Sequence, residues 1–148
     1  MCCAQNNADL DPIFLCAEVL MCPRNSCTTN CTTIESVKVT PSSGKVRSTF
    51  VFSVTVKALA PSGTGLTVVA VKCPLCGSSG QIDFGTLTTG FSAAGQVKTF
   101  NMSLDTAEDD WHYPAGTYQF EALSCKYGCG DQEGAIYDQV KGTFQITN

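Results

Sequence analysis

Charged residues and long apolar runs are both scarce in this chain of 148 residues. Charged side chains make up 15% of the sequence, and Trp and His occur once each. No run approaches the roughly 18 apolar residues of a membrane-spanning helix, so we predict no transmembrane segment. The formal net charge of −4 and the isoelectric point near 4.7 argue against nucleic acid or an anionic membrane surface as a partner.

The sequence offers little for catalysis. His112 is the only histidine that could serve as a base for a Ser or Cys nucleophile. Asp105, Glu108, Asp109 and Asp110 near it lack the alternate spacing of a calcium loop, so they are interpreted as a solvated acidic loop. Paired carboxylates of a glycoside hydrolase stay open as an alternative. We predict a protein that is not an enzyme and that has no cofactor or metal.

Cysteine, by contrast, is abundant and even in number. The ten cysteines are Cys2, Cys3, Cys16, Cys22, Cys27, Cys31, Cys73, Cys76, Cys125 and Cys129. This content predicts disulfides formed in an oxidising compartment. The glycosylation acceptors Asn30-Cys31-Thr32 and Asn101-Met102-Ser103 agree with a secreted glycoprotein. The first residues lack the basic and apolar regions of a signal peptide, so we expect a mature chain whose leader is removed or not included.

Residues 1–33 form a cysteine-rich N-terminal arm that holds six of these cysteines. Their pairing stays open among 15 connectivities. The arm also contains the most apolar short run of the chain, and its large apolar side chains are Ile13, Phe14, Leu15, Val19, Leu20 and Met21. One interpretation is that this run packs on its own domain. The other, which we adopt, is that it mediates self-association by docking on a neighbouring molecule.

Residues 34–148 have the pattern of an all-β domain. Strands are predicted over residues 34–40, 45–60, 66–72, 81–87, 97–104, 117–125 and 136–146, with turn residues between them. In the longest run Phe50, Phe52, Val54 and Val56 share one face. About seven strands at this spacing predict an immunoglobulin-like β-sandwich. The standard disulfide between the sheets of antibody domains is missing, because the second strand has no cysteine.

The stretch from Pro114 to Cys129 organises the rest of the domain. A Pro-Ala-Gly turn leads into a strand that places Tyr118, Phe120 and Ala122 on one face. A tyrosine at the entrance of such a strand is typical of the tyrosine corner of Greek-key sandwiches. We therefore predict a central strand here.

The last four cysteines could form two halves of a zinc site, Cys73-Pro-Leu-Cys76 and Cys125 with Cys129. The strands that end at Cys73 and Cys125 are predicted to be antiparallel neighbours, so these ends lie far apart. Local disulfides 73–76 and 125–129 at opposite ends of the sandwich fit better. Thioredoxin-like chemistry would need a βαβ setting that the sequence does not predict.

The last 45 residues resemble the ML lipid-recognition family, which includes the ganglioside-activator protein. The likeness is found in Gly116–Ala122, in a cysteine-bearing hairpin and in Lys141–Ile146. The N-terminal Asp11–Cys16 with Cys22-Pro23 also resembles the leaders of some secreted saposin- and ML-type proteins. The resemblance implies two splayed sheets with a lipid between them.

Three functions follow as hypotheses. The first is a non-catalytic extracellular glycoprotein, a structural subunit that assembles into a homo-oligomer or filament through its N-terminal arm. The second is a secreted ML-type lipid-binding or transfer protein, and the third is a small hydrolase or lectin. A carrier predicts an apolar cavity between the sheets, whereas a subunit predicts a well-filled sandwich.

Overall fold

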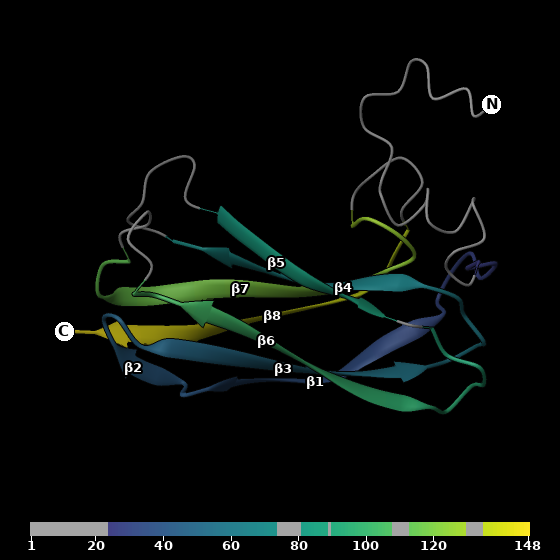
Figure 1. Cartoon of the computed structure of the whole chain (residues 1–148), viewed down its shortest axis with the longest axis horizontal. Coiled ribbons are helices and arrows are strands. Elements are labelled where there is room, and N and C mark those ends of the chain that lie inside the picture. Colours follow the sequence, from purple (N-terminus) through teal and green to yellow (C-terminus); the bar gives the residue numbers. More distant parts are fainter. Residues whose placement is uncertain (1–23, 74–80, 89, 108–112, 130–134) are drawn as a thin grey trace, which may run out of the picture.

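The protein is a β-sandwich of two packed sheets (Figure 1). The computed structural model describes residues 24–73, 81–88, 90–107, 113–129 and 135–148. Its strands are β1 (Thr32–Thr40), β2 (Ser43–Lys45), β3 (Thr49–Ala58), β4 (Gly65–Lys72), β5 (Gln81–Thr88), β6 (Val97–Asp105), β7 (Gly116–Cys125) and β8 (Ile136–Thr147). Within these ranges no helix is long and apolar enough to cross a membrane.

The two sheets differ in size. One has three strands in the order β1-β3-β6, and the other has five in the order β2-β8-β7-β4-β5. The predicted all-β class is confirmed, and every predicted strand is present. The additional strand, β2, has three residues and pairs with β8 in parallel. It escaped the sequence analysis because a strand this short, beside the Pro41 turn, has no measurable alternation.

Aromatic side chains fill the centre of the sandwich. Phe50, Phe52, Val54 and Val56 of β3 are all fully buried, as the alternation predicts. The ring of Phe52 lies edge-on to both Phe120 and Phe144, with centroids 5.4 Å apart in each case. Such T-shaped pairs add to the stabilisation from burial alone. The rings therefore tie the middle of one sheet to β7 and β8 of the other.

Strand β7 lies in the middle of the five-stranded sheet and begins with a tyrosine corner. The Tyr118 hydroxyl donates a hydrogen bond of 2.7 Å to the carbonyl oxygen of Pro114, which confirms the prediction for this residue. Burial, with a smaller contribution from Tyr113, raises the pKa of Tyr118 to about 12. The hydroxyl therefore stays a neutral donor at every physiological pH.

Strand β4 has β5 and β7 as its neighbours, so it lies inside its sheet and not at an edge. Val69 and Val71 point inward and are almost fully buried. On the outer face Leu66 and Val68 are half-buried and Lys72 is exposed. Strand β4 is therefore covered on its inner face and only in part on its outer one.

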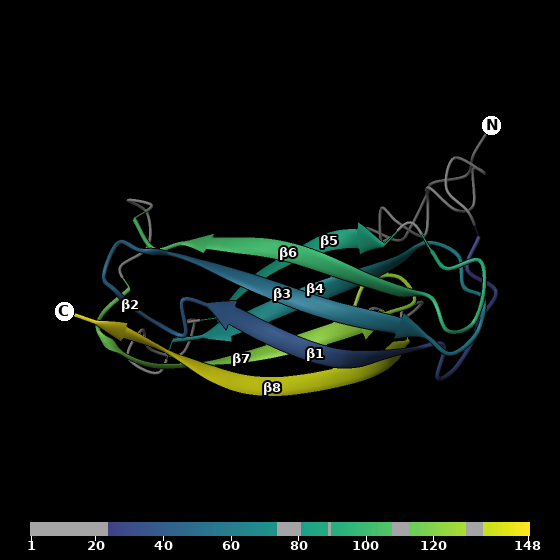
Figure 2. The ribbon, with the colours of Figure 1, turned by 90° about the horizontal axis from the view of Figure 1, so that it is seen from below.

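Strands β1 and β8 lie side by side along one side of the sandwich (Figure 2), and Asp138 of β8 joins them. Its Oδ2 accepts hydrogen bonds from the Thr33 hydroxyl at 2.8 Å and from the backbone N–H of Ile34 at 2.7 Å. Burial alone would raise the pKa of Asp138, but the hydrogen bonds from Ile34, Thr33 and Gln139 outweigh it and lower the pKa. Asp138 is therefore an ionised clamp between the two sheets.

Candidate functional site at the end of the sandwich where the arm begins

Residues 24–31, here called the arm root, are fixed to one end of the sandwich by Asn25. This side chain is 97% buried, with 3% exposed. Its Nδ2 donates to the carbonyl oxygens of Thr64 at 3.3 Å and of Lys126 at 3.4 Å. Its Oδ1 accepts a hydrogen bond from the backbone N–H of Cys27 at 3.1 Å. One amide thus joins the arm root to the start of β4 and the end of β7.

Tyr137 holds the arm root from the outer face of β8. Its hydroxyl donates to the carbonyl oxygen of Cys27 at 2.8 Å and lies 3.4 Å from Asn25 Oδ1. Burial is the largest influence on its pKa, which rises to about 12, although the Asn25 hydrogen bond lowers it and Tyr127 raises it further. Tyr137 is therefore a neutral, partly buried donor at the arm root.

A glycine makes this close approach possible. A Cβ added at Gly63 would lie 2.1 Å from the carbonyl oxygen of Arg24 and 2.5 Å from the backbone nitrogen of Asn25. Both distances are far below van der Waals contact, so no larger residue fits. The sequence identified Gly63 as part of a turn, but the structure shows that it also leaves room for the backbone of the arm root.

Two disulfides stiffen the same end. Cys27 and Cys31 are joined within the arm root, with their Cα atoms 6.1 Å apart. Cys125 and Cys129 are joined just after β7, with Cα atoms 5.4 Å apart, which is the local bond that their spacing predicts. The arm root is thus bounded by two short covalent loops.

Cys73 lies at the opposite end. In the antiparallel pairing of β4 with β7, Leu66 faces Cys125 and Lys72 faces Gln119. Cys73 is disulfide-bonded, and its predicted partner Cys76 lies outside the described residues. The separation of the two ends agrees with the prediction and removes the basis for a zinc site that shares Cys73 and Cys125. Among the described residues, no group of three or more His, Cys, Asp or Glu could hold a metal.

Several predicted residues lie outside the described ranges. These are Cys2, Cys3, Cys16, Cys22, Ile13, Phe14, Leu15, Val19, Leu20, Met21, His112 and the acidic residues Glu108, Asp109 and Asp110. Of the two glycosylation acceptors, Asn30 is exposed in the arm root with a φ of 50°. Asn101 is exposed on β6, as its alternation with Phe100 and Met102 predicts. Asn25 and Tyr137 were not identified from the sequence, because the hydrogen bonds from Asn25 to Thr64 and from Tyr137 to Cys27 join residues 39 and 110 positions apart.

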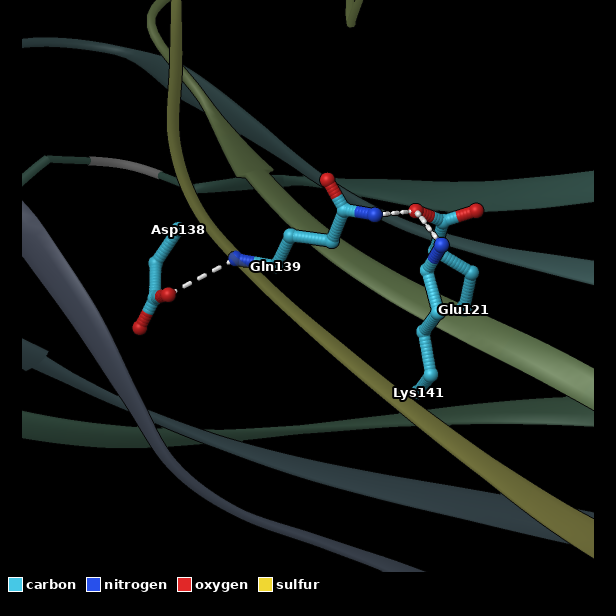
Figure 3. Close-up of polar contacts among 4 residues, drawn as sticks. All are labelled: Glu121, Asp138, Gln139 and Lys141. Carbon is cyan, nitrogen blue, oxygen red and sulfur yellow. Dashed lines mark hydrogen bonds and ion pairs between the residues drawn. The ribbon is translucent and has the colours of Figure 1, made fainter.

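A second feature is a polar array on the outer face of the five-stranded sheet (Figure 3). Glu121 Oε1 accepts a hydrogen bond from Gln139 Nε2 and lies 3.8 Å from Lys141 Nζ. Asp138 projects from the other side of β8. The array borders a hollow of about 290 Å³ that Lys72, Gln119 and Thr143 also line.

Among the described residues, Glu121 is the only carboxylate that lines this hollow. Glycoside hydrolysis of the usual kind needs a pair of carboxyl groups. The described lining residues supply a polar surface for contacts and one carboxyl group.

These features together define a class of protein, a β-sandwich module with a disulfide-stiffened end. The sequence identifies the family within this class, because the model of the Countin C-terminal domain family matches residues 32–148. The chain belongs to this family. It is similar to Countin-2 of Dictyostelium discoideum, with 32% identity over 140 residues, and to Countin-1 of the same organism, with 24% over 142. These alignments cover 95% and 96% of the chain but 53% of each relative, so the chain spans about half their length.

Solved structures share the fold at low sequence identity. The C-terminal domain of wzt has a TM-score of 0.60 at 14% identity, with 80% of this chain and 74% of that chain covered. The alkylpurine DNA glycosylase AlkC of Pseudomonas fluorescens has a TM-score of 0.57 at 14% identity, over 80% of this chain and 31% of that chain. These likenesses support the sandwich architecture only. The resemblance to the ML family stays a prediction.

Proposed function

We propose that this chain is a non-catalytic extracellular glycoprotein, a structural subunit that self-associates through the residues before Arg24 into a homo-oligomer or filament. The observation that supports this most directly is the fixed arm root. Asn25, Tyr137 and the Cys27–Cys31 disulfide hold it against the sandwich. The chain before Arg24 is therefore attached to a fixed position on the sandwich.

A rigid starting point favours docking on a partner. Part of the cost of association is the ordering of flexible segments, and a segment anchored at one end has less freedom to lose. The arm contains Ile13, Phe14, Leu15, Leu20 and Met21. Each such side chain contributes about 1.5–3 kcal/mol when it moves from water into an apolar contact. Burial of this run on a second molecule would offset much of the cost of ordering the arm.

The filled interior favours a subunit over a lipid carrier. Ring centroids of Phe50, Phe52, Phe120 and Phe144 lie 4.8–5.4 Å apart across the space between the sheets. A lipid of the ML type would need that space. The carrier nevertheless remains the second candidate function, because the resemblance in Gly116–Ala122 and Lys141–Ile146 supports it.

The localisation has separate support. Disulfides persist in oxidising, extracellular surroundings, and the described residues contain two bonds of this kind together with a bonded Cys73. Both asparagines of the glycosylation acceptors are exposed. We therefore assign the chain to the extracellular space, with sugars on Asn30 and Asn101.

Light scattering on the full chain tests the proposal. A double variant, Phe14→Ser with Leu20→Ser, should reduce the mean particle mass at least twofold, towards the monomer. Leu59→Ser is the matched control, because Leu59 is an apolar residue of the sandwich that is 49% exposed, and it should leave the mass unchanged. A wild-type chain that stays monomeric at high concentration would contradict the proposal. Native mass spectrometry that found one lipid per chain would favour the carrier.

A further inference from the structure

The two edge strands of the three-stranded sheet, β1 and β6, differ in how they are protected from pairing with another chain. An unpaired edge strand is a template for strand addition, and proteins protect such edges with bulges, prolines, charges or covering groups. Strand β1 is interrupted between Ile34 and Ser36, is clamped to β8 by Asp138 and is followed by Pro41. It has three devices of the expected kind.

Over the described residues, strand β6 has no bulge and no proline, and its one acidic residue, Asp105, is at its last position. Its pairing with β3 runs without a shift from Thr49 opposite Asp105 to Lys57 opposite Val97, and its sequence contains no proline. Its one lysine, Lys98, is turned back onto its own loop, where Nζ donates to the carbonyl oxygen of Gly90 and lies 4.9 Å from the centre of the Phe91 ring. Over the described residues, β6 is hydrogen-bonded to β3 alone. It is a regular edge of nine residues.

The glycosylation acceptor Asn101 stands in the middle of this edge strand. Its Oδ1 accepts a hydrogen bond of 2.7 Å from the Ser53 hydroxyl of β3. The oxygen and the nitrogen of an amide point in different directions from its carbon. Since the oxygen is held by Ser53 of β3, the nitrogen that would bear a sugar does not face Ser53, and a sugar on it can extend over β6 and its unpaired side.

We infer that the glycan on Asn101 is the protecting device of β6: it projects across the open edge and prevents this strand from pairing with β6 of a second copy. An N-linked glycan is bulky and strongly hydrated, so it excludes a strand that must approach to about 4.8 Å. The inference rests on the proposed function only in that Asn101 is glycosylated. It does not depend on the N-terminal arm.

The chemistry of β6 identifies a second copy as the occupant of an unprotected edge. Polar side chains on its exposed face already form a row of hydrogen bonds with β3, here called the polar ladder. In it the Thr55 and Thr99 hydroxyls are 3.0 Å apart, and the Ser53 hydroxyl donates a hydrogen bond to Asn101. An antiparallel pair of β6 strands centred on Asn101 would place Thr99 opposite Ser103 of the second copy. Hydroxyl groups that face each other across strands are a stabilising pair. The ladder would thus continue into the second molecule.

The test uses the full chain secreted from a eukaryotic host, with site occupancy measured by intact mass. Two variants remove the Asn101 glycan in different ways: Asn101→Gln replaces the acceptor, and Ser103→Ala keeps Asn101 but abolishes the acceptor motif. Asn30→Gln is the matched control, because it removes the sugar of the arm root. Asn101→Lys removes the glycan but places a charge on the edge. Light scattering over a concentration series gives the association constant, and hydrogen exchange reports on residues 97–105.

Asn101→Gln should raise the association constant at least tenfold over the wild type and slow exchange across residues 97–105, and Ser103→Ala, which also removes a hydroxyl group from the ladder, should raise the constant by a smaller factor. Asn30→Gln and Asn101→Lys should match the wild type. If the wild type bears the glycan and both variants keep its association and exchange, the inference is overturned while the arm-based function stands. Unmodified Asn101 in the wild type overturns the inference as well. A monomeric wild type with associating variants supports it and overturns the arm-based function instead.

Discussion

The interior and the arm root of this protein are stabilised by different interactions. Between the sheets, Phe52 is surrounded by aromatic rings and depends on burial and shape. At the arm root, Asn25 depends on hydrogen bonds to Thr64 and Lys126. An apolar contact tolerates small shifts, whereas a buried amide loses its stabilisation once a partner moves. Because the two regions depend on different interactions, we expect that the sandwich can remain folded while the arm root is released.

The largest effect is expected in the interior. Phe52→Ala should lower the free energy of unfolding by about 3–5 kcal/mol, because it removes a fully buried ring and leaves a cavity between Phe120 and Phe144. Denaturant unfolding measures the loss. Val51→Ala, the half-buried neighbour on the other face of β3, is the control and should cost less than about 1.5 kcal/mol. Equal losses for the two variants would show that the rings are not the main support of the fold.

The second prediction separates the two regions. Gly63→Ala should displace the arm root, since the new methyl group would overlap the backbone of Arg24 and Asn25, at a cost of about 1–3 kcal/mol. Trypsin cleavage after Arg24 should become faster, while the rest of the sandwich keeps its resistance. Ser62→Ala, at the adjacent position, should behave as the wild type. Unchanged cleavage in Gly63→Ala would mean that the close approach is not needed to hold the arm root.

The interior was largely predictable from sequence, whereas the arm root was not. Alternation along β3 identifies Phe50, Phe52, Val54 and Val56 as inward-facing because a strand side chain can point to only one of two faces. The tyrosine corner at Tyr118 was likewise predictable, because its hydrogen-bond partner is four residues away. The one local contact of Asn25, with the backbone N–H of Cys27, does not indicate that its side chain is buried against the sandwich. Its role depends on carbonyl oxygens of Thr64 and Lys126 that only the fold brings together.

The third prediction concerns the clamp on the β1 side. Asp138→Asn should cost about 1–2 kcal/mol at neutral pH, because the variant loses the charge but keeps an acceptor oxygen, and solvent screens this partly exposed group. The folded pKa of Asp138 lies below its unfolded value. Its stabilisation is therefore present above the unfolded pKa, near 4, and is lost as the pH falls through the folded pKa.

Denaturant unfolding at pH 7 and at pH 3 should accordingly show a smaller gap between wild type and Asp138→Asn at the lower pH. Glu35→Gln is the control, because Glu35 and Lys57 form an exposed ion pair 3.5 Å apart that should contribute little. A gap that stays constant with pH would contradict an ionised clamp.

The smallest effect is expected from the loss of one tyrosine hydroxyl group in each region. Tyr118→Phe and Tyr137→Phe each remove a hydroxyl that donates to a carbonyl oxygen, at 2.7 Å and 2.8 Å, and each should cost about 0.5–1.5 kcal/mol. Both folded pKa values are raised to about 12. The stabilisation is thus complete below the unfolded pKa of about 10 and is lost as the pH rises through 12.

The two variants should differ in where they act. Tyr137→Phe should speed trypsin cleavage after Arg24, because Cys27 loses its donor, whereas Tyr118→Phe should leave that rate unchanged. If both variants speed cleavage equally, the arm root and the interior unfold together and the comparison fails.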